Sequence, residues 1–584
     1  EEPRFAFVEE LSRPRRAVPP QPSTSTQEAP RYLYSYFGPY GDPLSDPRID
    51  PYPDGLLERL AELGVNGVWL HVVLRNLAPG EPEFPEFGAG CEVRLENLRK
   101  LVERAKRFGI GIYLYINEPR AMPREFFRNY PEIAGVAEGE YVTMCTSHPK
   151  VRAWLTRSLQ YVFSQVPNLA GVFTITASEN LTNCASHGRH KDCVRCRDRS
   201  ADEIIAEVNA AIEAGVHAAS PRAHVLVWDW GWHGHGDASS LIPLLPKSVW
   251  LMSVSEWGQS FERGGVAGQV GEYSLSVVGP GPRALKHWKV AQENGLKTAA
   301  KLQLGATWEL SAVPFVPVLD LVAEHCSRLA QVGVDGCMLS WTVGCYPSPN
   351  LAVANRLLSD KSATPDAVLN TVAQQRYGPR AVGAARQAWR LFSTAFQEYP
   401  FHIQVVYRGP QHWGPANLLF AEQTGYRATM VGFPYDDLDG WRGPYPREVF
   451  AQQFSRVATI WADGLREFAK VVALADEDKK PTAEADYRVA QAAQIHLASV
   501  ANQARFIMAR NRYYSARDAA DRAQAAATLD EILTAEISLA KQLYSITKCD
   551  SRIGFEASNH YYYVPLDLVE KVINCEYLRQ QFRQ

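Results

Sequence analysis

Residues 95–116 read LENLRKLVERAKRFGIGIYLYI, and this stretch decides the fold class. Apolar residues recur at helical spacing over Leu95–Phe108, and a short apolar run rich in Ile and Tyr follows at Ile110–Ile116. A helix that leads directly into an apolar strand is the repeating unit of parallel sheets covered by helices. The stretch therefore predicts an amphipathic helix followed by a buried parallel strand.

The same alternation extends in both directions over residues 31–360. It gives eight predicted strands: Tyr32–Phe37, Val65–Val72, Ile110–Ile116, Gly171–Ala177, Val225–Trp230, Val249–Ser255, Thr298–Leu304 and Gly336–Trp341. Eight strand–helix units favour a closed (β/α)8 barrel of the TIM type with long loops. An open doubly wound sheet is the alternative, but no Gly-rich phosphate motif follows the first strand.

The flanking segments differ in composition from the barrel. Residues 1–30 are predicted to be an N-terminal arm or linker, because 11–30 are rich in Pro, Ser and Thr. Residues 361–584 are predicted to form an α-helical C-terminal domain, with helical spacing at 365–398, 447–476, 482–520 and 522–547. Residues 400–446 interrupt it and are dense in Gly, Pro and aromatics. We expect this long irregular segment to fold over the barrel mouth, and a structural belt between domains is the alternative.

Net charge and hydropathy exclude some classes of partner. The formal net charge of −3 gives no basic field for nucleic acid or an anionic membrane. No apolar run reaches the roughly 18–20 residues that cross a bilayer. The oligomeric state stays open, and a homo-oligomer is compatible with the sequence.

Carboxylates follow five of the predicted strands. They are Glu118, Glu179, Asp229, Glu256 and Glu309. Catalytic groups of such barrels lie at the C-terminal ends of the strands. Cleavage of a glycosidic bond needs one carboxylic acid to protonate the leaving oxygen and a second group at the oxocarbenium-like centre. The alternative for each carboxylate is a helix cap or an ion pair.

Two segments carry a resemblance to a known family. YLYINEPRAMPREFFRNYPEI (113–133) and CTSHPKVRAWLTRSLQYVFSQVPNLAGVFTITASEN (145–180) resemble the third and fourth strand regions of family-20 glycoside hydrolases, the β-N-acetylhexosaminidases and their relatives. The resemblance places Glu179 on the general acid of that family, and His71 near a strand-two His. Trp228, Asp229 and Trp341 likewise match the Trp-Asp of strand five and the Trp of the last strand. It implies an exo-acting glycosidase with a carbohydrate substrate.

The chain departs from that family beside the acid. Ser178 stands where the family has the Asp that positions the acetamido group, and Val343 replaces the Glu of the final Trp-x-Glu. Without that Asp, we expect double displacement on a terminal β-linked sugar, with Glu309 as nucleophile. Asp229 and Glu256 are the next candidates for this role. A β-N-acetylhexosaminidase proper and a non-catalytic glycan-binding protein on a decayed barrel are the alternatives.

A cysteine and histidine cluster follows Glu179 directly. Cys184, His187, Cys193 and Cys196 give two close pairs of soft ligands, a pattern that suits tetrahedral zinc. A disulfide or a set of buried thiols is the alternative. Four protein ligands would make the metal structural, whereas three would leave a position open for water or a substrate hydroxyl.

Further side chains are expected to contact the sugar. They are His71, Glu118, Asp229, His233, Glu256, Trp308, Trp341, Arg408, His412 and Trp413. Because the chain begins at Glu1 and a glycan is the expected substrate, we expect a secreted or periplasmic protein whose leader has been removed.

Overall fold

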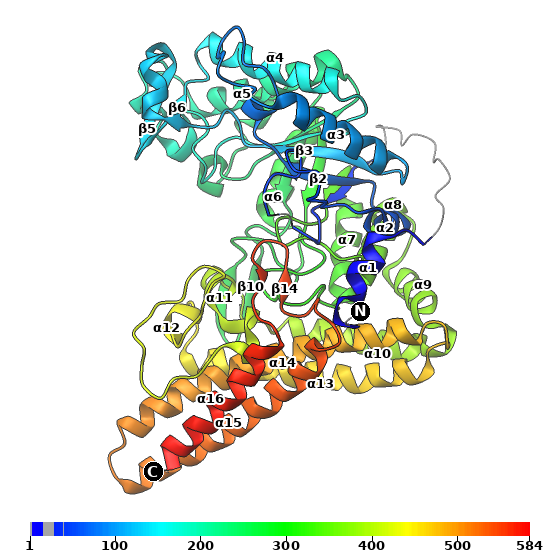
Figure 1. Ribbon diagram of the computed structural model, residues 1–584, viewed down its shortest axis with the longest axis vertical. Helices are drawn as coiled ribbons and strands as arrows, with labels where there is room; N and C mark the ends of the chain where they lie inside the picture. Colours follow the sequence, from blue (N-terminus) through cyan, green and yellow to red (C-terminus); the bar gives the residue numbers. More distant parts are fainter. Residues whose placement is uncertain (1–2, 16–28, 39, 584) are drawn as a thin grey trace.

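The computed structural model describes residues 3–15, 29–38 and 40–583 (Figure 1). Eight parallel strands close a barrel in the order β1-β13-β12-β9-β8-β7-β3-β2. Their bounds are β1 (Arg31–Leu33), β2 (Gly67–His71), β3 (Gly111–Ile116), β7 (Gly171–Ile175), β8 (His224–Trp228), β9 (Trp250–Val254), β12 (Lys297–Lys301) and β13 (Gly336–Met338). Each predicted strand overlaps one of them, which confirms the predicted (β/α)8 barrel.

Helices follow seven of the barrel strands. They are α2 (Asp54–Glu62), α3 (Cys91–Lys106), α4 (Pro149–Gln165), α5 (Ala201–Ala219), α6 (Pro282–Glu293), α7 (Leu319–Val332) and α8 (Pro349–Ser359). Between β8 and β9 the chain makes only short 3-10 turns, the last at Ile242–Leu244. The start of α5 shows how the sequence fixes a helix end, because Ser200 and Glu203 form a capping box there.

Aromatic side chains fill the barrel interior. The ring of Tyr32 lies 4.7 Å from that of Tyr113 and 5.6 Å from that of Phe173. Trp69 meets Phe173 edge-on at 5.4 Å. All four side chains are buried, and a fully buried Phe contributes about 1.5–3 kcal/mol relative to exposure. The interior is therefore a packed core, which leaves the strand ends as the place for a site.

Two connections at the C-terminal end of the barrel are enlarged. The β3–α4 connection carries a small sheet of β4 (Met122–Pro123), β5 (Ala134–Glu138) and β6 (Tyr141–Met144). The β9–α6 connection carries the hairpin of β10 (Ser260–Arg263) and β11 (Val266–Gln269).

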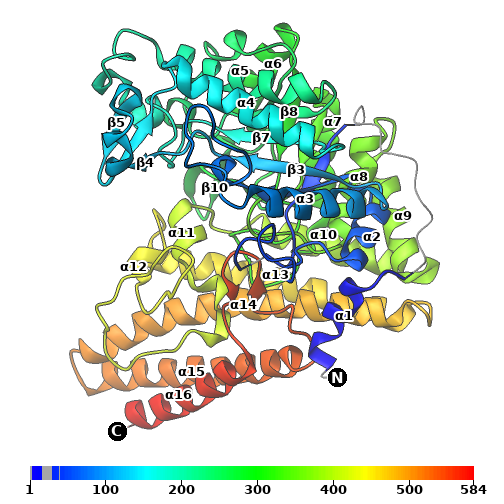
Figure 2. The same ribbon diagram turned by 45° about the horizontal axis from the view of Figure 1, so that its top comes forward.

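The rest of the chain is helical, as predicted. It contains α9 (Pro365–Tyr377), α10 (Val382–Phe396), α11 (Ile403–Arg408), α12 (Leu438–Trp441), α13 (Arg447–Leu474), α14 (Lys480–Tyr514), α15 (Ala519–Thr547) and α16 (Pro565–Arg583), with a hairpin of β14 (Phe555–Glu556) and β15 (His560–Tyr561). The long helices lie side by side below the barrel in both views (Figures 1 and 2).

Helix α1 (Ala6–Ser12) and the segment that precedes α16 both contact the barrel. Helix α1 packs on α2, with Phe7 and Leu11 buried, so this part of the predicted arm is folded. Residues 16–28 of the predicted linker lie outside the described residues. Near the C-terminus, the Gly554 amide donates to the Ala312 carbonyl at 2.8 Å. The division into arm, barrel and helical domain remains a prediction.

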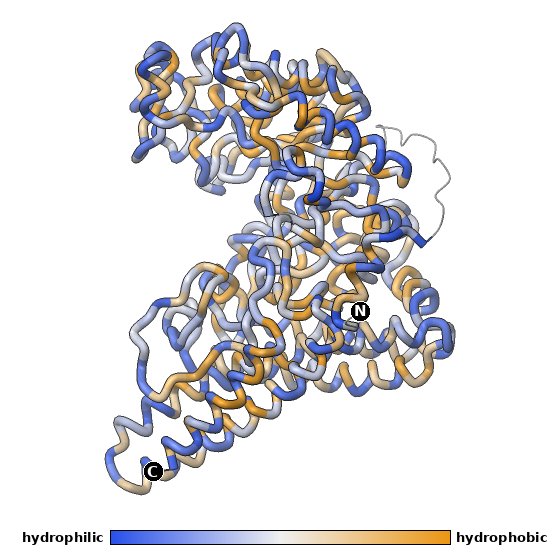
Figure 3. The backbone as a smooth tube through the Cα atoms, viewed as in Figure 1, coloured by the Kyte–Doolittle hydropathy of each residue, from blue (hydrophilic) through white to orange (hydrophobic). Residues whose placement is uncertain are grey.

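Hydrophobic residues concentrate along the barrel strands and inside the helical part (Figure 3). Across residues 3–15, 29–38 and 40–583, no helix combines the length and apolarity that a membrane crossing requires.

Candidate active site

An aromatic floor closes the barrel at the C-terminal ends of the strands. The indole of Trp341 stacks on Trp69 at 5.0 Å. Its edge meets the rings of Trp228 and Tyr115, each at 5.1 Å. Trp341 is partly exposed, whereas Trp69 and Trp228 are buried. The floor thus presents an apolar face of the kind on which a sugar ring can lie.

Glu179 stands beside this floor, in the loop that follows β7. Its side chain is exposed, and its carboxylate accepts a hydrogen bond from the Trp230 indole N–H at 2.9 Å. The Trp230 ring lies 4.6 Å from the ring of His235, which stacks on Trp257 at 4.3 Å. Glu179 therefore lies against an aromatic wall formed by the loops after β8 and β9.

A second carboxylate, Glu272, interacts electrostatically with Glu179. It follows the β10–β11 hairpin and is buried. Burial raises the pKa of Glu272 to about 7, against the opposing effects of Lys301 and of a hydrogen bond with Tyr407, and the charge of Glu179 raises it further. The two carboxylates thus differ in environment, one solvated and one desolvated, as in sites that combine two carboxyl roles.

Lys301 ends β12 and is buried in the barrel mouth. Its Nζ lies 2.9 Å from the centroid of the Tyr273 ring. Burial lowers the pKa of Lys301 to about 7, while Glu256 and Glu272 raise it. Burial likewise raises the pKa of Glu256 to about 8. The mouth therefore holds a cluster of ionisable groups with pKa values near neutrality, which is typical of functional sites.

Buried polar atoms without a hydrogen-bond partner gather at this end of the barrel. More than about nine in ten buried polar groups in folded proteins are paired, so a cluster of exceptions needs an explanation. Among the described residues, unpaired atoms follow or end the five neighbouring strands β3, β7, β8, β9 and β12: Asn117 Oδ1, Ser178 Oγ, Trp228 Nε1, Glu256 Oε2 and Lys301 Nζ. They include both donors and acceptors. A ligand with several hydroxyl groups would satisfy both kinds.

The structure places the predicted nucleophile Glu309 differently from the sequence prediction. Its side chain is fully buried and accepts four hydrogen bonds. They come from the Ser274 hydroxyl (2.6 Å), the amides of Leu275 (2.7 Å) and Ser276 (3.1 Å), and the Thr307 hydroxyl (3.0 Å). With both oxygens engaged, Glu309 anchors the loop next to Glu272, and this geometry favours a scaffold over a nucleophile.

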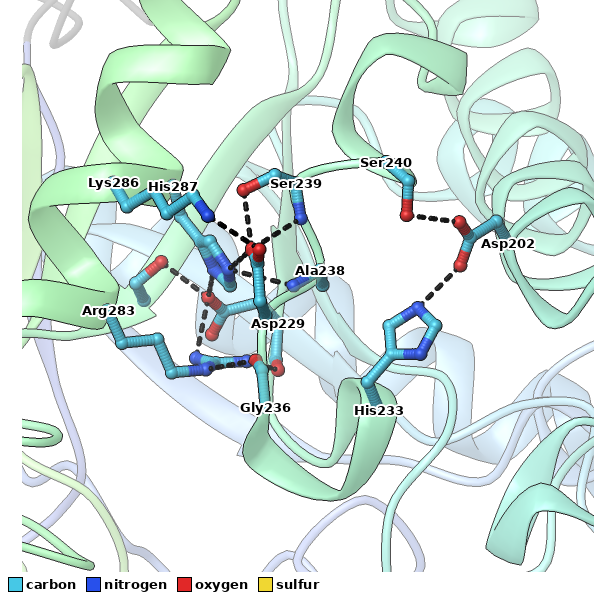
Figure 4. A network of polar contacts seen from close by, with 12 residues as sticks. Asp202, Asp229, His233, Gly236, Ala238, Ser239, Ser240, Arg283, Lys286 and His287 are labelled. Carbon is cyan, nitrogen blue, oxygen red and sulfur yellow. Dashed lines mark hydrogen bonds and ion pairs between the residues drawn. The ribbon is translucent and has the colours of Figure 1, made fainter.

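Asp229 and His233 are also held in structural contacts (Figure 4). The carboxylate of Asp229 accepts from Arg283 at 2.8 Å and contacts His287 Nδ1 at 2.7 Å, while its Oδ1 has no partner among the described residues. His233 pairs with Asp202 at 2.6 Å near the start of α5. Both side chains tie strand ends to neighbouring helices, outside the group around Glu179.

Two further predicted residues lie at the rim of the mouth. Glu118 accepts from the amides of Leu74 (2.8 Å) and Arg120 (3.0 Å) and so anchors its loop. His71 contacts the Arg120 guanidinium, and its ring lies 5.0 Å from that of Tyr115. Burial, and then the charge of Arg120, lower the pKa of His71 to about 4. A neutral His71 near Tyr115 can contact a sugar. Both carboxylate oxygens of Glu118 already accept backbone hydrogen bonds, so Glu118 is less able to bind one.

Three of the predicted residues, Trp308, His412 and Trp413, belong to one aromatic group. The ring of His412 lies 5.9 Å from that of Trp308, and the rings of His412 and Trp413 lie 5.5 Å and 5.7 Å from that of Tyr562. Arg408 is exposed. His412 is buried, with Nδ1 at 2.8 Å from the Ser311 hydroxyl and Nε2 at 2.9 Å from the Val406 carbonyl. The buried ring of Trp308 lies 6.3 Å from that of Tyr407. Trp413 stacks on Phe433 at 4.4 Å.

Four cysteines form a candidate metal centre, with one change from the predicted set. The sulfurs of Cys145, Cys184, Cys193 and Cys196 are buried and lie within 4.8 Å of one another. His187, which the spacing predicted as a ligand, instead contacts Glu138 at 2.9 Å and is replaced by Cys145. Cys145 follows β6, 39 residues before Cys184, so only the fold brings it to the cluster.

Comparisons with known proteins support the fold. No protein-family model matches the chain, nor does any curated protein sequence. Its structure is similar to that of a GH138 enzyme targeting pectin rhamnogalacturonan II, with a TM-score of 0.54 at 12% identity over 95% of this chain and 84% of that one. It is also similar to a family 89 glycoside hydrolase from Clostridium perfringens, solved with PUGNAc, with a TM-score of 0.50 at 13% identity over 95% of this chain and 64% of that one. The chain therefore spans just under two thirds of the family 89 protein.

The comparisons do not confirm the predicted relation to family 20. The GH20 exo-β-N-acetylglucosaminidase from Vibrio harveyi matches with a TM-score of 0.35 at 13% identity over 62% of this chain and 58% of that one. The chain shares its barrel fold with the GH138 and family 89 enzymes.

Proposed function

We propose that this protein is an exo-acting glycoside hydrolase that removes a terminal, β-linked sugar from a glycan or glycoconjugate. The unpaired polar atoms at five neighbouring strand ends carry the proposal, because they line the same barrel mouth as the aromatic floor. A sugar ring offers a face for Trp341 and hydroxyl groups for those atoms.

Glu179 is the general acid/base in this proposal. It is exposed at a strand end and directed by Trp230, so it can reach the leaving oxygen of a bound glycoside. Glu272 is the second carboxylate and replaces Glu309 as the nucleophile, because its charge interacts with that of Glu179 and it faces fewer donors than Glu309 does. Ionised Glu272 attacks the anomeric carbon as Glu179 gives its proton to the departing oxygen. Glu179 then takes a proton from the water that releases the sugar.

Zinc is the metal that we propose for the four cysteines. Tetrahedral zinc with Zn–S bonds of about 2.3 Å requires sulfurs about 3.8 Å apart. The sulfur of Cys145 lies 3.7 Å from that of Cys193 and 3.6 Å from that of Cys196, which fits. Bound there, zinc would supply a crosslink between the segment after β6 and the loop that carries Glu179. Four thiolates leave no open position for substrate, so the role is structural.

A β-N-acetylhexosaminidase remains the first alternative. Substrate-assisted cleavage needs an anionic side chain to orient the acetamido group, and Ser178 offers only a hydroxyl at the position next to Glu179. A non-catalytic glycan-binding protein is the second. Ligand binding by Glu179→Gln, with no hydrolysis by the wild type, would favour that second alternative.

The test is a screen of aryl β- and α-glycosides, including N-acetyl-β-glucosaminides, followed by trapping with a 2-fluoro sugar of the active configuration. We expect hydrolysis of a β-glycoside and a covalent label on Glu272 in the peptide map. A label on Glu256 or Glu309 would reassign the nucleophile. Absence of hydrolysis on every glycoside would overturn the proposed activity.

A further inference from the structure

A surface group of aromatic side chains lies outside the proposed active site. It belongs to the segment between α11 and α13, drawn in yellow beside α12 in Figure 1. Tyr426, Met430 and Phe433 are 66%, 62% and 56% exposed. Together with the partly exposed Trp413 and Tyr435, they form what we call the aromatic patch. Grouped exposed apolar side chains commonly mark a binding surface.

The rings of the aromatic patch form a single file. Trp413 stacks on Phe433 at 4.4 Å with the ring planes 27° apart. Phe433 lies 6.0 Å from Tyr435, and Tyr435 lies 5.2 Å from Tyr426. The file therefore runs outward over the surface from Trp413 to Tyr426.

The backbone that carries the aromatic patch is fixed, although it has little regular structure. The indole of Trp413 donates to the Gly432 carbonyl at 2.8 Å, and Asn417 donates to the Tyr435 carbonyl at 2.9 Å. The Ala428 amide donates to Asp437 at 2.9 Å. The backbone that carries the exposed rings is thus fixed before any ligand arrives, which lowers the entropic cost of binding.

The aromatic patch is continuous with the proposed active site. The Val431 amide, between Met430 and Phe433, donates to the Tyr407 carbonyl at 2.6 Å. The side chain of Tyr407 in turn lies beside Glu272 and lowers the pKa of that carboxyl. One tyrosine therefore separates the aromatic patch from a carboxylate of the barrel mouth.

We propose that the aromatic patch binds the glycan chain that extends beyond the cleaved bond, so that the physiological substrate is an oligosaccharide or polysaccharide. The inference rests on the proposed function, because it places the terminal sugar in the barrel mouth. Aromatic faces with polar edges suit successive sugar rings, which are apolar on their faces and polar at their rims. A single file of rings fits a linear chain better than a protein partner, whose stable interfaces bury roughly 1,200–2,000 Å².

The test is affinity electrophoresis of the full chain carrying Glu179→Gln in gels that contain rhamnogalacturonan II, xylan, mannan or a chitin oligosaccharide. We compare this protein with versions that also carry Phe433→Ala and Tyr426→Ala, or Tyr577→Ala. Tyr577 is a matched control because it is 57% exposed on α16 and has no ring contact with another aromatic side chain among the described residues. At least one polysaccharide should retard the parent and the Tyr577→Ala protein. Loss of the two patch rings should weaken this binding about fivefold to tenfold per ring.

Equal retardation of the patch variant and the parent would overturn the inference, as would retardation by none of the polysaccharides. Patch-dependent self-association in light scattering would also overturn it, in favour of a protein contact. If the wild type hydrolyses no glycoside yet binds a polysaccharide through the aromatic patch, the proposed activity fails and the binding site stands. If the wild type is active, the patch variant should show a lower ratio of kcat/KM on the oligosaccharide to kcat/KM on the aryl glycoside.

Discussion

The indole N–H of Trp230 donates to the carboxylate of Glu179 at 2.9 Å, across the gap between the loops after β8 and β7. Close backbone contact makes this possible. Gly231, next to Trp230, adopts a positive φ of 79°, and a Cβ there would collide with Ala177 and Ser178. Trp230 thus limits the directions in which Glu179 can point.

Trp230→Phe should lower kcat/KM about twofold to tenfold, because it keeps most of the ring and removes a hydrogen bond of about 0.5–1.5 kcal/mol. Steady-state kinetics on the best aryl glycoside measure the effect. Trp257→Phe is the control, since Trp257 belongs to the same aromatic wall and makes no hydrogen bond with Glu179 among the described contacts. A larger loss in Trp257→Phe than in Trp230→Phe would contradict the directing role.

Glu309→Gln should lower the free energy of unfolding by about 2–4 kcal/mol, because a buried acceptor of four hydrogen bonds becomes an amide whose NH2 faces donors. Urea unfolding measures this change. The folded fraction should keep more activity than Glu272→Gln does. Unchanged stability combined with complete loss of activity would return Glu309 to the role of nucleophile.

The sequence predicted the barrel because each strand–helix unit has its own local signal, as residues 95–116 illustrate. The residues of the candidate site were harder to predict from the sequence. Glu272 follows a hairpin instead of a barrel strand, so the rule that selected Glu179 and Glu309 does not reach it. Lys301 is the last residue of β12, between Ala300 and Leu302, and a Lys in such a sequence gives no indication of burial until the neighbouring strands are known.

The cysteine cluster illustrates the same limit. Cys193 and Cys196 are close in sequence and were recognised, whereas Cys145 lies in the preceding connection. Strand β6 brings it beside them, and no spacing rule predicts a contact of that sequence separation. His187 had suitable spacing, but its ring is directed to Glu138.

Cys145→Ser should reduce bound zinc and lower the Tm, whereas His187→Ala should keep a full equivalent of zinc. The reason is that the four cysteine sulfurs lie within 4.8 Å of one another without His187. A structural zinc site contributes folding free energy directly. Elemental analysis and thermal unfolding, each with and without a chelator, measure both quantities. Loss of zinc in His187→Ala with zinc retained in Cys145→Ser would restore the predicted ligand set.

The kcat/KM profile should rise with pH through about 7, because burial raises the pKa of Glu272 to about 7 and the proposed mechanism needs it ionised. Tyr407→Phe removes a hydrogen bond that favours the ionised form of Glu272. The rising limb of the kcat/KM profile should therefore move to higher pH by about half a unit to one unit. Tyr399→Phe is the control, since its hydroxyl has no partner among the described residues. A profile that only falls through pH 7, with no rising limb there, would make Glu272 the acid; a falling limb at higher pH is expected in either case, because the acid must be protonated.

The same raised pKa has a consequence for stability. The folded state holds the proton of Glu272 more tightly than the unfolded state does, whose Glu pKa is about 4.3. The stabilising contribution of this group is therefore fully present below about pH 4.3 and is lost as pH rises through about 7. Glu272→Gln removes this dependence. The free energy of unfolding of the variant minus that of the wild type should therefore increase between pH 5 and 8, by about 1.4 kcal/mol per unit of pKa shift. Parallel urea titrations at both pH values measure the difference, and a difference between wild type and variant that stays constant over this range would show that Glu272 is already ionised in the folded protein at pH 5.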